Sequence, residues 1–130
     1  MRNENLRNSI LALSASPEVQ IRLYPDDVCK GEELILDFES AYISSDLEDF
    51  LPDEREAIRD LDRLLEKYSG KEFEEMYFYD EALFNDPRWA EIRARAKETS
   101  RVLGWDGEPR KNGAIYVTRS EVTKNESANK

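Results

Sequence analysis

The chain contains no histidine and only one cysteine, Cys29, among its 130 residues. Zinc sites built from Cys and His, and catalytic triads that use His as the base, are therefore excluded. A single cysteine also rules out an intramolecular disulfide, which fits the reducing cytoplasm where we expect this protein to work. Because no His is available to activate the thiol, we expect Cys29 to be a buried structural residue.

Glycine clusters and long apolar runs are missing as well. The five glycines are isolated from one another, so the chain has no Gly-rich loop that could cradle a phosphate. No run of 18 apolar residues occurs, which argues against a membrane-spanning helix. The N-terminus carries only a short apolar patch, residues 10–13, and makes a poor signal peptide.

Charge of one sign is abundant. The formal net charge is −10, and residues 26–86 alone hold 21 acidic against 6 basic side chains, a net charge of −15. Residues 87–130 carry a net charge of +4. An acidic balance argues against direct nucleic-acid binding, which needs Lys and Arg to displace counterions, and against binding to an anionic membrane. We expect the acidic middle of the chain to face a basic protein partner.

Apolar periodicity predicts a mainly α fold, a compact single-domain bundle of about five helices within residues 1–105. Helix starts are marked by Ser16-Pro17, by Pro52 and by Asp86-Pro87, and we expect Gly70 and Gly104 to end helices in the left-handed conformation. The helices are predicted at 3–15, 17–24, 31–45, 52–68 and 87–103, with a short one at 80–83.

The segment 31–45 is the most informative of these helices. Leu34, Phe38 and Ala41 fall on one face, with Ile35 and Tyr42 beside it, which indicates a buried stripe. Much of the remaining circumference is acidic. We therefore expect this helix to be at once part of the core and the centre of a docking face.

The links between helices are less regular. We expect Leu47, Phe50 and Leu51 to hold a loop against the core, and Trp105 to fold back onto it. Residues 71–79 fit neither the helical nor the strand period, so we predict an irregular segment or a single helical turn. Residues 106–130 read as a loop, a short strand at 114–118 and a flexible tail.

The candidate site consists of carboxylates only. Nine acids lie on or beside the helix at 31–45, and they are Asp26, Asp27, Glu32, Glu33, Asp37, Glu39, Asp46, Glu48 and Asp49. We predict no catalytic residue, no cofactor and no metal ligand, since the calcium-loop and di-iron patterns are absent. Any one of these acids is as easily a solvated surface residue.

Three other interpretations remain open at the level of the sequence. One is a small carboxylate-dependent hydrolase or a metal-binding helical protein, which would use two or more of the acids. Another is a helical scaffold or adaptor domain. A third concerns the basic face of the helix at 87–103, with Arg88, Arg93, Arg95, Lys97 and Arg101. Pairing within the fold or plain solvation explains that face more simply than nucleic-acid binding does.

Four segments together resemble a known family. They are 11–29 (LALSASPEVQIRLYPDDVC), 32–42 (EELILDFESAY), 57–70 (AIRDLDRLLEKYSG) and 80–105 (DEALFNDPRWAEIRARAKETSRVLGW). In this order and spacing they resemble the small immunity proteins of bacterial contact-dependent growth inhibition systems. The resemblance covers about residues 10–105, and residues after Trp105 depart from the pattern.

The resemblance implies a cytoplasmic antitoxin of bacterial competition. Such a protein binds the C-terminal toxin domain delivered by a neighbouring cell, in a 1:1 complex, and neutralises it. These toxins are often nucleases, whose basic active sites suit an acidic inhibitor that mimics a phosphate backbone. The net charge of −15 across residues 26–86 agrees with that mechanism.

Overall fold

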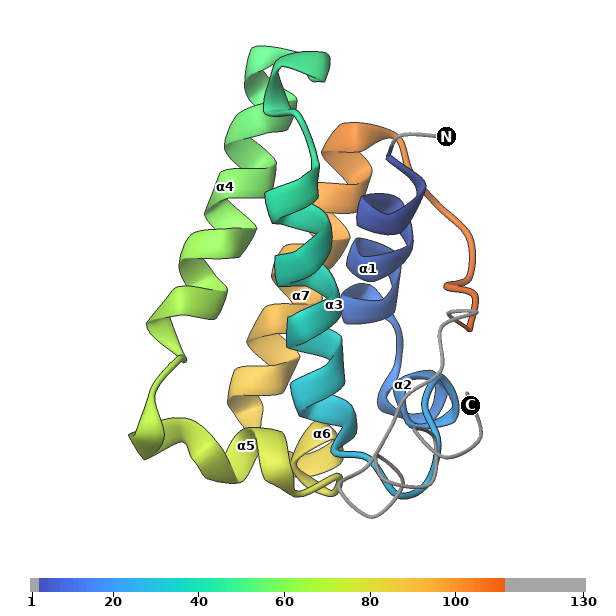
Figure 1. Ribbon diagram of the computed structural model, residues 1–130, viewed down its shortest axis with the longest axis vertical. Coiled ribbons are helices and arrows are strands. Elements are labelled where there is room, and N and C mark those ends of the chain that lie inside the picture. Colours follow the sequence, from blue (N-terminus) through green and yellow to red (C-terminus); the bar gives the residue numbers. More distant parts are fainter. Residues whose placement is uncertain (1–2, 112–130) are drawn as a thin grey trace, which may run out of the picture.

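The computed structural model describes residues 3–111, and within them the chain is mainly helical (Figure 1). The predicted mainly α fold is thus confirmed. The segment 114–118, predicted as a strand, lies outside the described residues. In chain order the helices are α1 (Glu4–Ser14), α2 (Pro17–Arg22), α3 (Lys30–Ser44), α4 (Pro52–Lys67), α5 (Glu74–Phe78), α6 (Ala82–Asn85) and α7 (Pro87–Leu103), with 3₁₀ turns η1 (Leu47–Asp49) and η2 (Lys71–Phe73).

The four long helices run roughly side by side, and the short helices α2, α5 and α6 gather at one end (Figure 1). The closest pairs are α1 with α7, α4 with α7, and α1 with α3. Helix α7 therefore forms the centre of the bundle, while α3 and α4 are each packed mainly against other helices. This arrangement leaves the facing sides of α3 and α4 partly uncovered.

Local capping chemistry sets where several helices begin and end. The side chain of Ser16 accepts a hydrogen bond from the Val19 amide at 3.3 Å, and the Asp86 carboxylate accepts one from the Arg88 amide at 2.9 Å. Both satisfy amide groups that the first turn of a helix leaves unpaired. Gly104 ends α7 in the left-handed conformation with φ 71°. These three boundaries confirm the predictions from the sequence.

The core joins the predicted apolar stripes. Leu34 and Phe38 of α3 are fully buried, as are Ile58 and Leu61 of α4. Trp89 of α7 is also buried, and its indole Nε1 donates a 2.7 Å hydrogen bond to the carbonyl of Met76 in α5. A buried indole N–H needs such a partner. This bond therefore links the first turn of α7 to α5.

The start of α3 approaches α5 closely at Gly31. A Cβ atom added there would lie 3.1 Å from Cζ2 of Trp89, and 3.2 Å from both the Met76 carbonyl oxygen and the Tyr77 Cα. A methyl group there would force the indole or that backbone to shift by a few tenths of an ångström. Packing therefore favours glycine at this position, which lies inside a helix rather than at a turn.

Residues 71–79 differ from the irregular segment that we expected. They form the 3₁₀ turn η2 followed by the short helix α5, so the alternative of a helical turn is the better description. The reason is tertiary: Met76 is buried, and the Tyr77 ring lies edge-on to Trp89 at 5.9 Å. These contacts select the helical conformation that the local pattern leaves undecided.

Two further expectations were wrong in detail. Phe50 is buried and lies edge-on to Trp105 at 6.0 Å, as predicted, but Leu51 is 63 % exposed. Leu51 immediately precedes α4, where the chain turns outward. Gly70 does have a positive φ, 118°, but its ψ of 168° is not that of a left-handed helix cap. Helix α4 instead ends at Lys67, and Tyr68 is its C-terminal cap residue.

Candidate functional site

Helix α3 separates the predicted acidic residues into two groups. Glu32 and Glu39 line a groove between α3 and α4, whereas Asp37 lines a pocket between α1 and α3. The helical period explains the division. Glu32 and Glu39 are seven residues apart and share a face, whereas Asp37, two residues before Glu39, lies about 160° around the helix from it. The predicted acids therefore surround α3 rather than forming one continuous patch.

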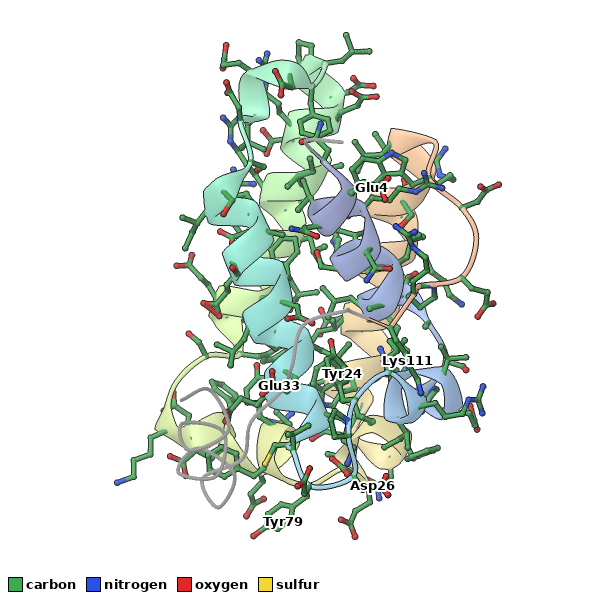
Figure 2. The ribbon with its side chains drawn as sticks, turned by 45° about the vertical axis from the view of Figure 1, so that its right-hand side comes forward. Glu4, Tyr24, Asp26, Glu33, Tyr79 and Lys111 are labelled. Carbon is green, nitrogen blue, oxygen red and sulfur yellow. The ribbon has the colours of Figure 1, made fainter. Side chains whose placement is uncertain are left out.

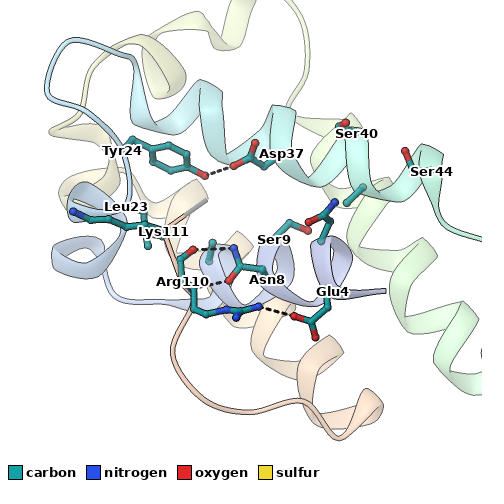
Figure 3. A pocket seen from close by; sticks show the side chains of 13 residues that line it. Glu4, Asn8, Ser9, Leu23, Tyr24, Asp37, Ser40, Ser44, Arg110 and Lys111 are labelled. Carbon is teal, nitrogen blue, oxygen red and sulfur yellow. Dashed lines mark hydrogen bonds and ion pairs between the residues drawn. The ribbon is translucent and has the colours of Figure 1, made fainter. Parts of the chain in front are cut away.

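The pocket between α1 and α3 is polar and encloses about 340 Å³ (Figure 3). The hydroxyl of buried Tyr24 donates a 2.7 Å hydrogen bond to Oδ2 of Asp37. Glu33, one turn earlier on α3 (Figure 2), has a raised pKa, caused first by burial and then by the neighbouring charges of Asp37 and Glu32. Asp37 is thus partly engaged in holding Tyr24 and is less available to a partner than the sequence suggests.

A segment from the end of the described chain borders the same pocket. The Arg110 amide donates to Oδ1 of Asn8 at 2.7 Å, and Nδ2 of Asn8 donates to the Arg110 carbonyl at 2.9 Å (Figure 3). The Arg110 guanidinium pairs with Glu4 at 2.5 Å. These contacts fasten Arg110 to α1. They also bring positive charge to this side of α3.

The groove between α3 and α4 has a different character, because its floor is apolar. It encloses about 590 Å³, and its lining includes Leu36, Ile43 and Phe78, whose side chains are 48 %, 81 % and 47 % exposed. Its edges carry five carboxylates, and no Lys or Arg is among the residues that line it. The five are Glu32, Glu39, Asp62, Glu66 and Glu74. An exposed apolar floor with a charged rim is typical of a protein-binding surface.

Burial and neighbouring negative charges both raise pKa values of groups in the groove. Partial burial raises the pKa of Asp62, and the nearby carboxylate of Glu66 raises it further, while Arg63 lowers it. Burial likewise raises the pKa of the Tyr42 phenol. Arg63 is exposed and pairs with Glu56 at 2.8 Å and Asp60 at 2.5 Å, so much of its charge is already compensated.

The remaining predicted acids lie at the two ends of α3. Asp26 and Asp27 are exposed before its start, and Asp26 lies at the end of the molecule where the short helices gather (Figure 2). Asp46, Glu48 and Asp49 are exposed after its end, in and beside η1. A 15-residue helix is about 22 Å long, so these two groups are too far apart to contact one small ligand. They can only be parts of an extended protein interface.

Two of the end acids also serve the fold. The Asp46 side chain accepts a 3.0 Å hydrogen bond from the Glu48 amide and so caps η1. Glu48 pairs with Arg55 of α4 at 3.4 Å. Lys30, which we did not single out from the sequence, is only 2 % exposed and lies 3.1 Å from the Asp80 carboxylate. Its Nζ also donates to the Asp26 carbonyl at 2.7 Å, which fixes the α2–α3 loop.

The site predicted from the sequence omits Leu36, Ile43 and Phe78, and also the groove acids Asp62, Glu66 and Glu74. On α3, Leu36 and Ile43 fall outside the apolar stripe, and the missed signal is their spacing. Leu36 and Ile43 are seven residues apart, as are Glu32 and Glu39, so the two pairs run together along one face. That face is neither plain core nor plain solvated surface.

The basic side chains of α7 are largely engaged within the fold. Arg88 pairs with Asp86 at 2.7 Å, and Arg93 donates to the Leu83 carbonyl at 2.9 Å and to Gln20 at 3.3 Å. Arg101 pairs with Glu98 at 2.5 Å on its own helix. Arg88 therefore pairs with a carboxylate of the acidic region 26–86, as predicted. Arg93 donates to neutral oxygens, and Arg101 pairs with an acid of its own helix. Arg95 and Lys97 are exposed.

The described residues assemble no metal-ligating cluster of three or more His, Cys, Asp or Glu side chains. Cys29 is half-buried, and burial, followed by the charges of Glu32 and Asp80, raises the pKa of its thiol. A raised pKa keeps the sulfur neutral and weakly nucleophilic. The Cys29 thiol is therefore poorly suited to act as a nucleophile at neutral pH.

Comparison with protein-family models, curated proteins and solved structures finds no match to this chain. The resemblance to immunity proteins accordingly stays a prediction from the sequence. None of the helices between residues 3 and 111 combines the length and apolar character needed to cross a bilayer.

Proposed function

We propose that this protein is an immunity protein that binds and neutralises a basic toxin domain through the acidic surface formed by α3 and α4. The observation that carries the proposal is the groove between these helices, with its exposed apolar floor and five carboxylates but no basic side chain in its lining. The resemblance in sequence to immunity proteins of contact-dependent growth inhibition supports the same conclusion. The protein acts by binding, without catalysis or a cofactor.

The mechanism follows from charge. Nuclease toxins bind polyanions, so their active sites are basic, and a surface rich in carboxylates can occupy such a site in place of phosphate groups. The exposed acids at both ends of α3, Asp26 with Asp27 and Asp46 with Asp49, extend the negative surface beyond the groove. Long-range attraction would speed association in the cytoplasm, and the apolar floor would slow dissociation. Direct binding of nucleic acid is disfavoured by the net charge of −10.

The proposal is tested by co-expression with the protein encoded next to this one. We expect a 1:1 complex that abolishes the toxicity of that neighbour. The double variant Glu32→Lys/Glu39→Lys should lower the association rate by about tenfold or more at low salt, because it removes negative charge from the groove and introduces positive charge. Stopped-flow fluorescence at two salt concentrations measures the effect.

Glu108→Lys is the matched control, because Glu108 is exposed in the loop after α7 and lies outside the groove. Like each of the two groove substitutions, it replaces one negative charge with a positive one. It should alter the association rate only slightly. Equal rates for the wild type, the double variant and the control would refute the assignment of the interface to α3 and α4. Failure to bind or protect against any neighbouring protein would refute the immunity function.

A further inference from the structure

We propose that the groove between α3 and α4 receives one amphipathic helix of the partner, with apolar side chains facing the floor and Lys or Arg along both edges. The inference rests on the proposed function and deepens it, because it names the structural element that the acidic surface recognises.

The shape of the groove suits a helix. Helix α3 packs closely against α1 and α5, and α4 against α7, but α3 and α4 are not a closely packed pair. The groove is lined on α3 from Glu32 to Ile43, about three helical turns, and on α4 from Asp62 to Glu66. A helix laid over the groove would contact α3 along these turns and the C-terminal half of α4 beside it.

The floor presents apolar side chains at helical spacing. Leu36 and Ile43 are two turns apart on α3, about 10 Å along its axis. An incoming helix with apolar residues at i, i+3 or i+4, and i+7 presents its own stripe over the same distance. Phe78, at the end of α5, limits the groove where α3 begins. The exposed fractions of Leu36 and Ile43, 48 % and 81 %, would fall sharply under such a helix.

The charges on the walls specify a cationic helix. Glu32 and Glu39 stand on the α3 wall, Asp62 and Glu66 stand on the α4 wall, and Glu74 lies beyond them on α5. An incoming helix with basic residues on both flanks of its apolar stripe meets opposite charge on each side. A helix with acidic flanks meets like charge on both and is rejected. The raised pKa of Asp62 agrees with a carboxylate held beside other acids in a partly desolvated place.

A second copy of this chain does not supply the required helix from its described part. Helix α7 has basic residues on its outer side, but its apolar residues Trp89, Ile92 and Ala96 are fully buried in the core. Helices α1 and α4 bury their apolar faces as well. No helix within residues 3–111 exposes an apolar stripe between two basic edges, which points to a different protein as the source.

The test uses the full chain and two synthetic helices. One is an 18-residue Leu/Lys peptide with an amphipathic helical pattern, and the other replaces every Lys with Glu. We expect fluorescence anisotropy to show saturable 1:1 binding of the Leu/Lys peptide and none of the Leu/Glu peptide. The variant Ile43→Lys should weaken binding by about tenfold or more, because it places a charge on the floor and repels the basic edges.

Leu51→Lys is the matched control, since Leu51 is 63 % exposed and lies outside the groove. It should change the affinity less than about twofold. Because Ile43 is 81 % exposed, its replacement should leave the fold intact, and circular dichroism checks this. Equal weakening by Ile43→Lys and Leu51→Lys would overturn the assignment to the groove, and comparable binding of the Leu/Glu peptide would overturn the assignment of a cationic occupant.

The cognate complex separates this inference from the proposed function. Loss of protection in both Ile43→Lys and Glu32→Lys/Glu39→Lys supports the helix in the groove. Full protection by Ile43→Lys with loss in the charge variant overturns the inference and leaves the immunity function standing. Self-association of the wild type that Ile43→Lys abolishes would identify a second copy as the occupant, and would overturn the inference as well.

Discussion

Asp62 is a residue whose negative charge is unfavourable in the free protein. It lies on the α4 wall of the groove, half-buried, and the carboxylate of Glu66 follows it by one helical turn. Burial and that neighbouring charge both raise its pKa, so the ionised form is less favourable in the folded protein than in the unfolded chain. A basic partner would reverse the balance by supplying the missing opposite charge.

We therefore expect Asp62→Asn to stabilise the free protein by about 0.2–0.5 kcal/mol near pH 7, the usual size of a like-charge pair one turn apart. The sign follows from the raised pKa: the wild type recovers stability as the pH falls through the folded-state pKa, so the advantage of Asn fades toward about pH 4. Urea unfolding across this range measures it, with Asp106→Asn in the exposed loop as control. A loss of stability near pH 7 would contradict this account of Asp62.

Tyr77 is a second residue whose titration reports on the fold. Its hydroxyl donates a 2.6 Å hydrogen bond to the Tyr68 carbonyl at the end of α4, and burial raises the pKa of its phenol to about 12. Since the neutral phenol is the favoured form, its contribution is complete below about pH 10 and is lost as the pH rises through about 12.

Tyr77→Phe should accordingly cost about 0.5–1.5 kcal/mol at neutral pH, the usual net contribution of one hydrogen bond. It should also make the protein less sensitive to alkali, because one ionisation coupled to unfolding is removed. Urea midpoints at about pH 7 and 11 give both quantities. The same alkaline loss of stability in variant and wild type would show that other groups, and not Tyr77, control it.

At the scale of elements, the junction between α3 and α5 depends on Gly31. In an ordinary helix interior, alanine is more favourable than glycine by about 1 kcal/mol. Here the added methyl group would press on the Trp89 ring and on the backbone of Met76 and Tyr77. The backbone cannot move aside as a flexible side chain would, so the steric effect should outweigh the gain in helix propensity.

We expect Gly31→Ala to destabilise the protein by about 1–3 kcal/mol, the typical cost of overpacking. Ser40→Ala, at an exposed position of the same helix, should instead change stability by a few tenths of a kcal/mol in the favourable direction. Urea unfolding of both variants provides the comparison. If Gly31→Ala were as stable as the wild type, α3 and α5 could separate without cost, and the close approach would have no structural role.

The elements that local chemistry determines are the ones that the sequence predicts well. Ser16, Asp86 and Gly104 mark helix boundaries because the groups that they satisfy lie within a few residues of them. The helicity of 74–78 depends on Trp89, which lies 13 residues beyond Met76 in the chain, and no local pattern contains that contact. Prediction fails where the deciding contact is distant.

The candidate site, too, is predicted from the sequence only in part. The sequence identifies an acidic region and places it around α3, but it cannot tell which acids face α1 and which face α4. Asp37 is paired with Tyr24, while Glu39 lines the groove, although the two are only two positions apart in the sequence. The groove itself depends on how α3 and α4 are spaced, which is set by their separate packing on α1 and α7.

On the scale of the whole molecule, the fold concentrates like charge on α3 and α4 before any partner arrives. Residues 26–86, which include both helices, carry a net charge of −15. Repulsion across the groove opposes closure of the two walls, and this helps to keep the apolar floor accessible. Binding and stability should consequently respond to salt in opposite directions.

We expect added NaCl, from about 20 to 300 mM, to raise the urea midpoint of the free protein, because screening weakens repulsion between the walls. The same salt should slow association with a basic partner. Glu32→Lys/Glu39→Lys should reduce the salt effect on stability, since it removes part of the repulsion at its source. The surface pairs Arg63–Glu56 and Arg101–Glu98 act the other way, because screening weakens their attraction. A midpoint that falls with salt would mean that such pairs outweigh the repulsion, and the groove would then have to be held open by packing alone.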